Sequence, residues 1–552
     1  MRLAPYATLL VLAPLVGSNV QAAGFYATEL GARAIGRAGA DVVHPKDGYA
    51  VWSNPAALAN QKGVSFTTDA IGVQLNLEYQ RTGPFSLSES THDYGGYRVH
   101  NRPHAEIDPS DIGLEPGDDW QRVFTTGNNP SQATVTNKAS PFVLNCSAVI
   151  GDGLDGHGHC PILDGILIIG ERGHGVRGLT LSLAVYGPPT GGYWFWDESL
   201  AVDPGKPEAE RYIDSKGFDR RFTGPQRYIL IDRDVLEAFY QFTTAYKLGR
   251  YLAVGVGLQW VQSGLRMRTA VSADTYGTED PNYDAVINID ASNLFLPSAN
   301  IGLWSNPIAG LELGLSYQLM RPVTVRGPAR VDYKAPGLSD FVIDDSNAQA
   351  TIRFNMPAIA RLGAMYRLDP WFDVEAALVW EQWSSWTHNS VDVADLLFSV
   401  PGLDAVPMPT VIQPKAYQDT LGLRVGGDVD PLGGFLPGLL TLRGGVLYET
   451  SAIPDSTLDV SLIDAEKWGI STGVELAYAG VHLRVAYQHR FLAERTVNDT
   501  VASVIAPLGD ILGYETRTAA ANGVYKASFD VGAVALTLDA MEMYDYFAEP
   551  RP

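Results

Sequence analysis

The sequence predicts an all-β protein: a 14-stranded antiparallel transmembrane β-barrel with a small N-terminal hatch, or plug, in its lumen. Three observations favour this fold. They are an export signal, apolar residues that alternate with a period of two, and connections that switch between short turns and long polar loops. The 552 residues include 56 glycines and 34 prolines, which suits a chain with many turns.

Composition excludes several other classes of protein. The mean hydropathy is -0.03, whereas a polytopic helical membrane protein needs repeated apolar runs of ~20 residues. An aromatic content of 10% is too high for a disordered chain. The net charge of -22 argues against nucleic acid as a partner, because nucleic-acid binding needs a basic surface.

The N-terminus indicates export. Arg2 precedes a short apolar run at residues 7–16, and Val20-Gln21-Ala22 has the small-x-small pattern of a cleavage site. We therefore assign residues 1–22 to a signal peptide. An exported chain without a membrane helix is periplasmic, secreted or a β-barrel, and the strand pattern places this one in the outer membrane of a Gram-negative bacterium.

Period-2 apolar stripes recur along the mature chain, at residues 71–79, 252–260, 311–319, 372–380 and 481–487. In a barrel wall, alternate residues face lipid and lumen, so we expect these stripes to face lipid and their terminal aromatic residues to lie at the membrane interface. A soluble β-sandwich would also alternate. However, strands of ~9–11 residues or more are long enough to cross a bilayer.

The pattern predicts a barrel over residues 64–538. Its fourteen expected strands are 64–79, 142–150, 178–187, 236–246, 251–264, 298–305, 311–325, 351–367, 371–383, 417–427, 438–449, 466–478, 481–494 and 524–538. Short turns such as Ala479-Gly480 alternate with long polar loops such as 265–297. The segment 151–178 lies where a short turn is expected, and we interpret it as an insertion.

The ends of the mature chain lie outside this pattern. Residues 23–63 lack period-2 stripes but are too apolar for a solvated tail, so we expect them to form the hatch. Residues 539–552 form a C-terminal tail beyond the last strand.

The chain resembles the FadL-type family of outer-membrane transporters for long-chain fatty acids and other hydrophobic compounds. The motifs that carry the resemblance are Ala23-Gly24-Phe25, Gly36-Arg37-Ala38-Gly39-Ala40, Asn54-Pro55-Ala56-Ala57-Leu58, Leu183-Ala184-Val185-Tyr186-Gly187-Pro188, Gly255-Val256-Gly257-Leu258, Trp380-Glu381-Gln382-Trp383-Ser384 and Ile453-Pro454-Asp455. The resemblance implies a fourteen-stranded barrel with a hatch, passive diffusion of a hydrophobic substrate, and lateral exit through a kinked third strand. It also implies that Phe25 gates a lumen pocket, and we expect Asn54, Pro55 and Ala56 to hold the hatch to the wall.

Alternation places Arg361, Arg424, Arg443 and Arg484 on the lumen face, where each could bind a carboxylate head group. The alternative is structural: barrel interiors hold paired charges, so Arg361 could pair with Asp373 or Glu375, and Arg484 with Glu475. Gly187, Pro188 and Pro189 end the third strand. Because proline cannot donate to the ladder, they mark either a lateral opening or a simple strand end.

Other functions remain as alternatives: transport of aromatic hydrocarbons or other lipids, a general porin, or a surface adhesin. A barrel lipase is disfavoured because His482 and His489 face opposite sides of one strand and no Ser-centred motif accompanies them. We expect no enzyme activity and no cofactor. The expected partners are a hydrophobic small molecule, outer-membrane lipids and, during biogenesis, the outer-membrane assembly machinery, with the barrel itself a monomer.

The two cysteines, Cys146 and Cys160, lie close in an exported chain, where a local disulfide is the default. Cys160 follows His157 and His159, but a structural metal site needs four well-spaced ligands, so we expect no metal. Thiol labelling of purified, unreduced protein should therefore modify neither cysteine until a reductant is added. Labelling of both without reduction would contradict the disulfide.

Overall fold

The computed structural model describes residues 29–43, 45, 47–61, 63–81, 90–94, 97–101, 134–137, 142–144, 165–169, 178–187, 192–196, 222, 224, 226–273, 283–339, 341–399, 405–502 and 520–548. The predictions for the signal peptide and for Phe25, Cys146, Cys160, Pro188 and Pro189 fall outside these residues.

Antiparallel strands form a closed ring. Within the described residues, fourteen strands pair in the order β1 (Val64–Arg81), β6 (Gly165–Ile169), β7 (Leu179–Tyr186), β9 (Asp232–Leu248), β10 (Leu252–Ser272), β11 (Asp284–Ile308), β12 (Leu311–Gln318), β16 (Ile359–Asp369), β17 (Phe372–Glu381), β22 (Thr420–Val429), β23 (Leu440–Glu449), β24 (Lys467–Tyr478), β25 (Val481–Leu492) and β27 (Gly523–Asp539). β27 then pairs with β1, from Ser65 opposite Asp539 to Arg81 opposite Gly523. Closure removes the unpaired edges that lipid would not tolerate.

Shorter strands extend this wall. They include β4 (Thr134–Asn137), β5 (Phe142–Leu144), β8 (Gly192–Phe195), β13 (Arg321–Lys334), β15 (Gln349–Met356), β18 (His388–Ala394), β21 (Val411–Pro414) and β26 (Arg495–Val497). A separate three-stranded sheet consists of β14 (Val342–Asp344), β19 (Leu397–Ser399) and β20 (Val406–Pro407), and a hairpin of β2 (Ser90–Tyr94) and β3 (Tyr97–Asn101).

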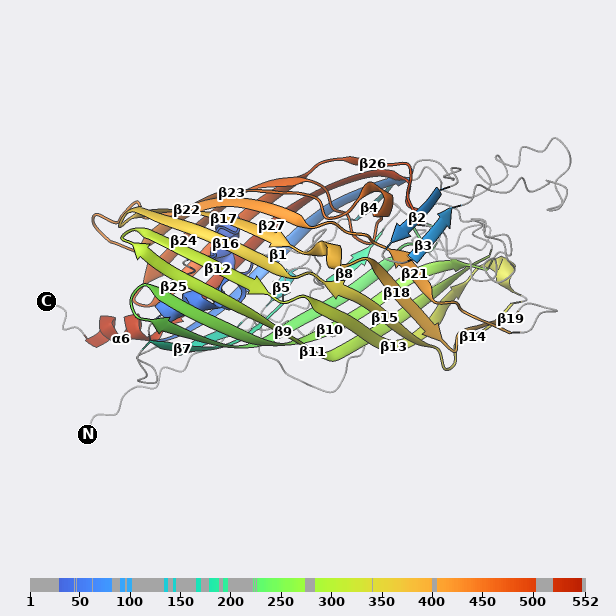
Figure 1. Cartoon of the computed structure of the whole chain (residues 1–552), viewed down its shortest axis with the longest axis horizontal. Coiled ribbons are helices and arrows are strands. Elements are labelled where there is room, and N and C mark those ends of the chain that lie inside the picture. The colour runs from blue at the N-terminus through green and yellow to red at the C-terminus, as the bar shows by residue number, and fades with distance from the viewer. Residues whose placement is uncertain are drawn as a thin grey trace, which may run out of the picture.

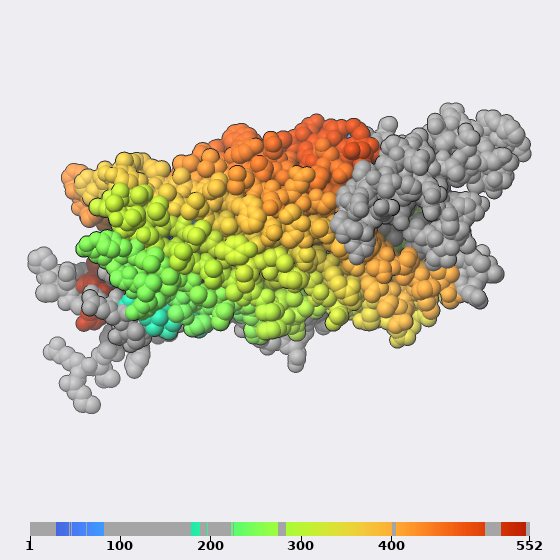
Figure 2. All heavy atoms as spheres, viewed as in Figure 1, coloured from blue at the N-terminus to red at the C-terminus, as the bar shows by residue number. Residues whose placement is uncertain are grey.

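The two ends of the barrel differ. Helix α6 (Ala540–Ala548) lies at one end, with the short turns, and β14 and β19 lie at the other, with the long connections (Figures 1 and 2). α6 follows the last strand directly, and the Asp539 backbone amide donates to the Gly480 carbonyl in the β24–β25 turn at 2.7 Å. We call these ends the short-turn end and the long-loop end. No helix in the described part of the chain is long and apolar enough to cross a membrane.

Most of the predicted lipid-facing stripes point outward. Leu258 on β10, Leu315 on β12, Leu378 on β17 and Val485 on β25 are between 39% and 60% exposed, while their sequence neighbours are buried or partly buried. Partly exposed tryptophans such as Trp260 and Trp380 lie at the ends of these stripes. This arrangement is typical of a lipid-facing band with an aromatic girdle.

The prediction for residues 71–79 was wrong. On β1, the apolar side chains of Ile71, Val73, Leu75, Leu77 and Tyr79 are at most 2% exposed, and they belong to the interior apolar cluster. The polar alternates, such as Asn76, point outward. Alternation identified the strand but not which of its two faces points to the lipid, because the lumen beside β1 is itself apolar.

The predicted second wall strand also needs correction. The second wall position is made of three pieces, β4, β5 and β6, which all pair with β1, so the prediction of one strand at 142–150 was wrong. Leu144 and Ile166 are far apart in the chain, yet their partners on β1, Ala70 and Thr67, are only three positions apart. The insertion therefore interrupts the second wall strand; it does not lengthen a turn.

The loop predicted at 265–297 is largely strand. β10 and β11 continue their pairing from Gly264–Ser292 to Ser272–Asp284. Val271, Val286, Ile287 and Ile289 are buried there, since the barrel extends beyond its lipid-facing band and keeps an apolar interior.

Candidate functional site

The N-terminal segment, residues 29–61, packs against the inner face of the barrel wall. It contains α1 (Ala32–Gly36), α2 (Ala50–Ser53) and the 3-10 helix η1 (Pro55–Asn60), and most of its described side chains are buried. α1 contacts β23, β24, β25 and β27, whereas η1 contacts β7, β9, β10 and β11. The blue helices of this segment lie within the ring of strands, nearer to α6 than to β14 (Figure 1).

Glycines on inward positions of the wall allow the backbone of the segment to approach closely. A Cβ atom at Gly255 would lie 2.4 Å from the Ala56 amide nitrogen, and one at Gly302 would lie 2.1 Å from Asn54 Oδ1. On the opposite side, a Cβ at Gly426 would lie 2.3 Å from the Arg37 carbonyl oxygen. Any side chain at these positions would force the segment or the wall to shift.

Asn54 connects the segment to the wall. Its Nδ2 atom donates to the carbonyl oxygens of Val42 and Leu303, each at 3.0 Å, and its Oδ1 atom accepts a hydrogen bond from the Ala56 amide at the start of η1. Pro55 follows at the first position of η1, where its missing N–H costs nothing. Asn54, Pro55 and Ala56, which we predicted to hold the hatch, thus all lie at its contact with β10 and β11.

Neutral side chains of the neighbouring strands bind the same part of the segment. Gln241 and Asn300 both donate to the Val51 carbonyl, at 2.9 and 2.7 Å, and the Ser316 hydroxyl donates to the Ser53 carbonyl at 2.6 Å. These bonds satisfy backbone groups at the end of α2 that the short helix leaves unpaired.

Ion pairs hold the α1 side of the segment. The Arg37 Nη1 atom lies 2.8 Å from Asp373 Oδ1 and 2.6 Å from Asp428 Oδ1. Arg33 also pairs with Asp428, at 3.2 Å, and both arginines are fully buried. Glu375 accepts hydrogen bonds from the backbone amides of Val42 and Val43.

Sequence reasoning missed Arg33 and Arg37, although arginines in an otherwise Ala- and Gly-rich segment were a visible signal. It named Asp373 and Glu375 only as possible partners of Arg361, and in the structure Arg37 forms ion pairs with both carboxylates. The Arg361 guanidinium lies over the Trp52 ring of α2, 5.1 Å from its centroid.

The other three predicted arginines are buried in ion pairs. Arg484 pairs with Glu475 at 3.1 Å, as expected. Arg443 pairs with Asp428 and with Glu475. Arg424 lies 3.0 Å from Glu449 on the wall and 3.7 Å from Glu29 of the N-terminal segment.

Glu29 marks the beginning of the described segment. Burial raises the pKa of its carboxyl, but Arg490 and Arg424 outweigh this effect and hold the pKa below its usual value. Glu29 therefore stays ionised at neutral pH and joins the segment to Arg424 of β22 and Arg490 of β25.

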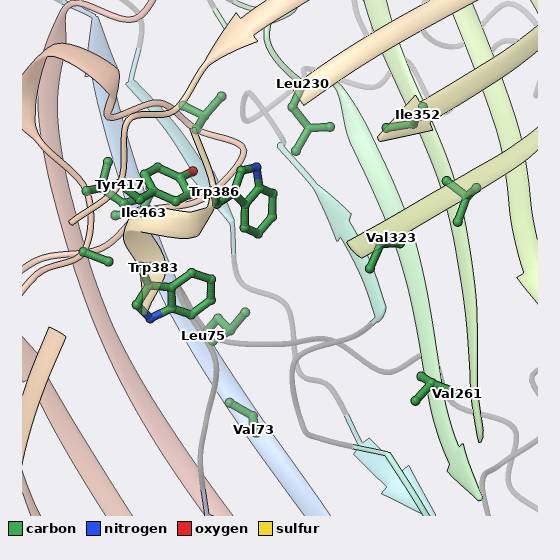
Figure 3. Close-up of a cluster of buried hydrophobic side chains, with 14 of the residues drawn as sticks. Val73, Leu75, Leu230, Val261, Val323, Ile352, Trp383, Trp386, Tyr417 and Ile463 are labelled. Carbon is green, nitrogen blue, oxygen red and sulfur yellow. The ribbon is translucent and has the colours of Figure 1, made fainter. Parts of the chain in front are cut away.

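A buried apolar cluster lies in the lumen (Figure 3). Trp386, next to the 3-10 helix η7 (Trp383–Ser385), stacks on Phe354 at a centroid distance of 5.0 Å and meets the edge of Tyr417 at 5.5 Å. Figure 3 draws residues from separate parts of the wall and its connections around them: Val73 and Leu75 of β1, Leu230, Val261 of β10, Val323 of β13, Ile352 of β15 and Ile463. This is the chemistry of a site for an apolar ligand.

β7 and β8 both pair with β9, on either side of residues 187–191. β7 pairs with β9 as far as Tyr186 opposite Phe239, and β8 resumes the pairing at Gly192 opposite Val235. Gly187 directly follows the last paired residue of β7. From Tyr186 to Gly192 the chain advances six positions while β9 advances four, so the pairing changes register there, and a lateral opening at Gly187, Pro188 and Pro189 stays a prediction.

Comparisons with known proteins agree with this geometry. The model of the family described as outer membrane protein transport protein (OMPP1/FadL/TodX) matches residues 225–536, more than half of the chain. A comparison with curated proteins finds no match.

Solved structures share the fold at low sequence identity. A Pseudomonas aeruginosa FadL homologue is similar with a TM-score of 0.63 and 16% identity, over 94% of this chain and 100% of that chain. The Ralstonia pickettii toluene transporter TbuX has a TM-score of 0.50 and 15% identity, over 93% and 98% of the two chains. The Pseudomonas putida toluene transporter TodX has a TM-score of 0.50 and 13% identity, over 94% and 100%.

The glycine contacts generate a prediction for the lumen. Gly302→Ala should displace η1, because the new Cβ overlaps Asn54 Oδ1, and the barrel should conduct ions measurably better in planar bilayers. Gly532→Ala is the matched control: it is also a strand glycine, but no atom lies within 4 Å of its Cβ position. Equal conductance of the two variants and the unmodified protein would show that the contact at Gly302 does not hold the segment in place.

Proposed function

The chain belongs to the OMPP1/FadL/TodX family of outer-membrane transport proteins, and on this basis we propose that it admits long-chain fatty acids through a lumen pocket gated by its N-terminal segment. The family and the fold are those of transporters of hydrophobic compounds and not those of enzymes. The proposal has three parts: fatty acids are the substrate, the N-terminal segment is the gate, and the exit is lateral.

The apolar cluster around Trp386 is the observation that carries the proposal. A passive channel has no energy source, so its pocket must bind the substrate well enough to remove it from the outer surface, yet release it further down. Stacked and edge-on aromatic rings with aliphatic neighbours supply such binding without charge. The 46% hydrophobic composition of the chain is thus partly explained by an apolar interior, not only by an apolar outer face.

In this proposal the N-terminal segment is the gate. It is part of the predicted hatch, residues 23–63, whose free N-terminus forms when the signal peptide 1–22 is removed. Phe25 would contact the substrate in the lumen, and a shift of the segment would let it pass. The number of hydrogen bonds and ion pairs to the wall supports a small, local shift over complete release.

The exit route in this proposal is lateral, near Gly187, Pro188 and Pro189. The change of register between the β7–β9 and β8–β9 pairings supports it, because a proline in the wall cannot donate to the neighbouring strand. We further expect the barrel to act as a monomer, with the outer-membrane assembly machinery as a partner only during insertion. The tail predicted at 539–552 should remain outside the wall after Asp539, the last residue of β27.

Monoaromatic hydrocarbons are the second candidate class of substrate. TbuX and TodX are described as toluene transporters, and the aromatic rings of the apolar cluster would also stack on a monoaromatic compound. The buried arginines of the lumen favour an anionic head group, but Arg424, Arg443 and Arg484 already have carboxylate partners. A test with both substrates separates the two classes.

Trp386→Ala should weaken binding of a labelled long-chain fatty acid to the purified protein by roughly ten- to a hundredfold, because a buried aromatic contact is lost. Trp468→Ala is the matched control, since Trp468 lies on the outer wall and is 52% exposed. Uptake of labelled fatty acid and of toluene by cells with equal surface levels should show which substrate depends on Trp386. Unchanged fatty-acid binding in Trp386→Ala would contradict the proposed pocket, and loss of toluene uptake alone would favour the second class.

A further inference from the structure

An outward-facing pair of arginines lies on neighbouring strands of the long-loop half of the barrel. Outer-membrane barrels carry their long loops on the extracellular side, so this half lies in the outer leaflet. Arg326 on β13 and Arg353 on β15 are both exposed. The register places Arg353 opposite Thr324, two residues from Arg326, so the two guanidinium groups are diagonal neighbours on one face. Neither forms an ion pair or a side-chain hydrogen bond in the part of the chain that the structure describes.

Hydroxyl side chains flank both arginines. Arg326 lies between Ser292 of β11 and Thr351 of β15, and Arg353 lies between Thr324 of β13 and Ser390 of β18. Phosphate oxygens accept hydrogen bonds from guanidinium and hydroxyl groups. The planar guanidinium can bind a phosphate through two parallel hydrogen bonds.

Neither of the two nearby carboxylates pairs with Arg326 or Arg353 in the described part of the chain. Asp290 of β11 pairs with Arg266 at 3.1 Å. Asp392 of β18 accepts a hydrogen bond from the Thr410 hydroxyl at 3.3 Å. The two arginines therefore present positive charge to the outside of a chain whose net charge is -22.

The pair lies directly above the lipid-facing band. On β11, the side chains two and three positions below Ser292, Leu294 and Phe295, are 66% and 63% exposed. Phe295 packs near the girdle residue Trp260, at a centroid distance of 5.8 Å. β11, β13 and β15 lie side by side in Figure 1, and their outer surface faces the viewer in yellow-green in Figure 2.

We propose that Arg326 and Arg353 bind the phosphate groups of the phosphorylated glycolipid of the outer leaflet, while Leu294 and Phe295 contact its acyl chains. The apolar side chains below and the donors above match a lipid with a phosphorylated head group, whereas a free phosphate ion would gain nothing from the apolar side chains. The interaction also offsets repulsion between an acidic barrel and a phosphate-rich leaflet. It is independent of the substrate that crosses the lumen.

The test compares Arg326→Gln/Arg353→Gln with Arg250→Gln. Arg250 is the matched control because it is also exposed but lies in the β9–β10 turn at the short-turn end. Purified barrels would be titrated with bisphosphorylated lipid A in detergent, with its dephosphorylated form, and with inorganic phosphate as competitor. Heat-dependent gel mobility would verify that each variant is folded.

The double variant should bind bisphosphorylated lipid A roughly tenfold more weakly or worse, because charge-assisted hydrogen bonds are lost. The Arg250→Gln variant should bind bisphosphorylated lipid A like the unmodified protein. Dephosphorylated lipid A should bind the unmodified protein only weakly, with an affinity no higher than that of the double variant for bisphosphorylated lipid A. Equal binding of the two lipid forms, or an unchanged affinity in the double variant, would overturn the proposal. Full displacement by an equimolar amount of inorganic phosphate would instead assign the arginines to a free anion and overturn the lipid assignment.

Discussion

The ion pairs of Arg33 and Arg37 with Asp373 and Asp428 set the constraint on which the rest of the lumen depends. Both guanidinium groups are fully buried, and a buried charge without a partner is strongly destabilising. The carboxylates lie on β17 and β22, so the N-terminal segment and this part of the wall must form together. Arg443 links Asp428 onward to Glu475, which also binds Arg484. One connected network thus joins the segment to β17, β22, β23, β24 and β25.

The other side of the lumen uses neutral contacts. Asn54, Gln241, Asn300 and Ser316 bond to backbone groups, and Gly255 and Gly302 let that backbone lie against the wall. Each of these hydrogen bonds contributes little to stability by itself, but breaking one would leave a buried carbonyl group unpaired. Ionic contacts on one side and neutral contacts on the other give the segment two different attachments.

The sequence predicted much of the wall, because each lipid-facing strand must alternate. The stripes on β10, β12, β17 and β25 face outward as expected, and the count of fourteen strands agrees with the ring of the described residues. Alternation failed on β1, where Ile71 to Tyr79 face an apolar lumen and hydrophobicity no longer distinguishes the two faces. It also failed where the barrel extends beyond the lipid: β10 continues to Ser272 and β11 begins at Asp284, within a stretch that the sequence predicted to be a loop. The ion pairs of Arg37 join residues that are more than 300 positions apart in the chain, and no local sequence pattern specifies them.

The central claim is that the N-terminal segment fills the lumen of a closed barrel. Single-channel recording in planar bilayers tests it most directly, with the intact protein compared to a form that lacks residues 23–60. The account predicts that the intact barrel stays closed to ions and that the shortened barrel, once folded and inserted, shows large and stable conductance. Equal conductance of the two forms would contradict it, because the lumen would then be open, or blocked by other residues, whether or not the segment is present.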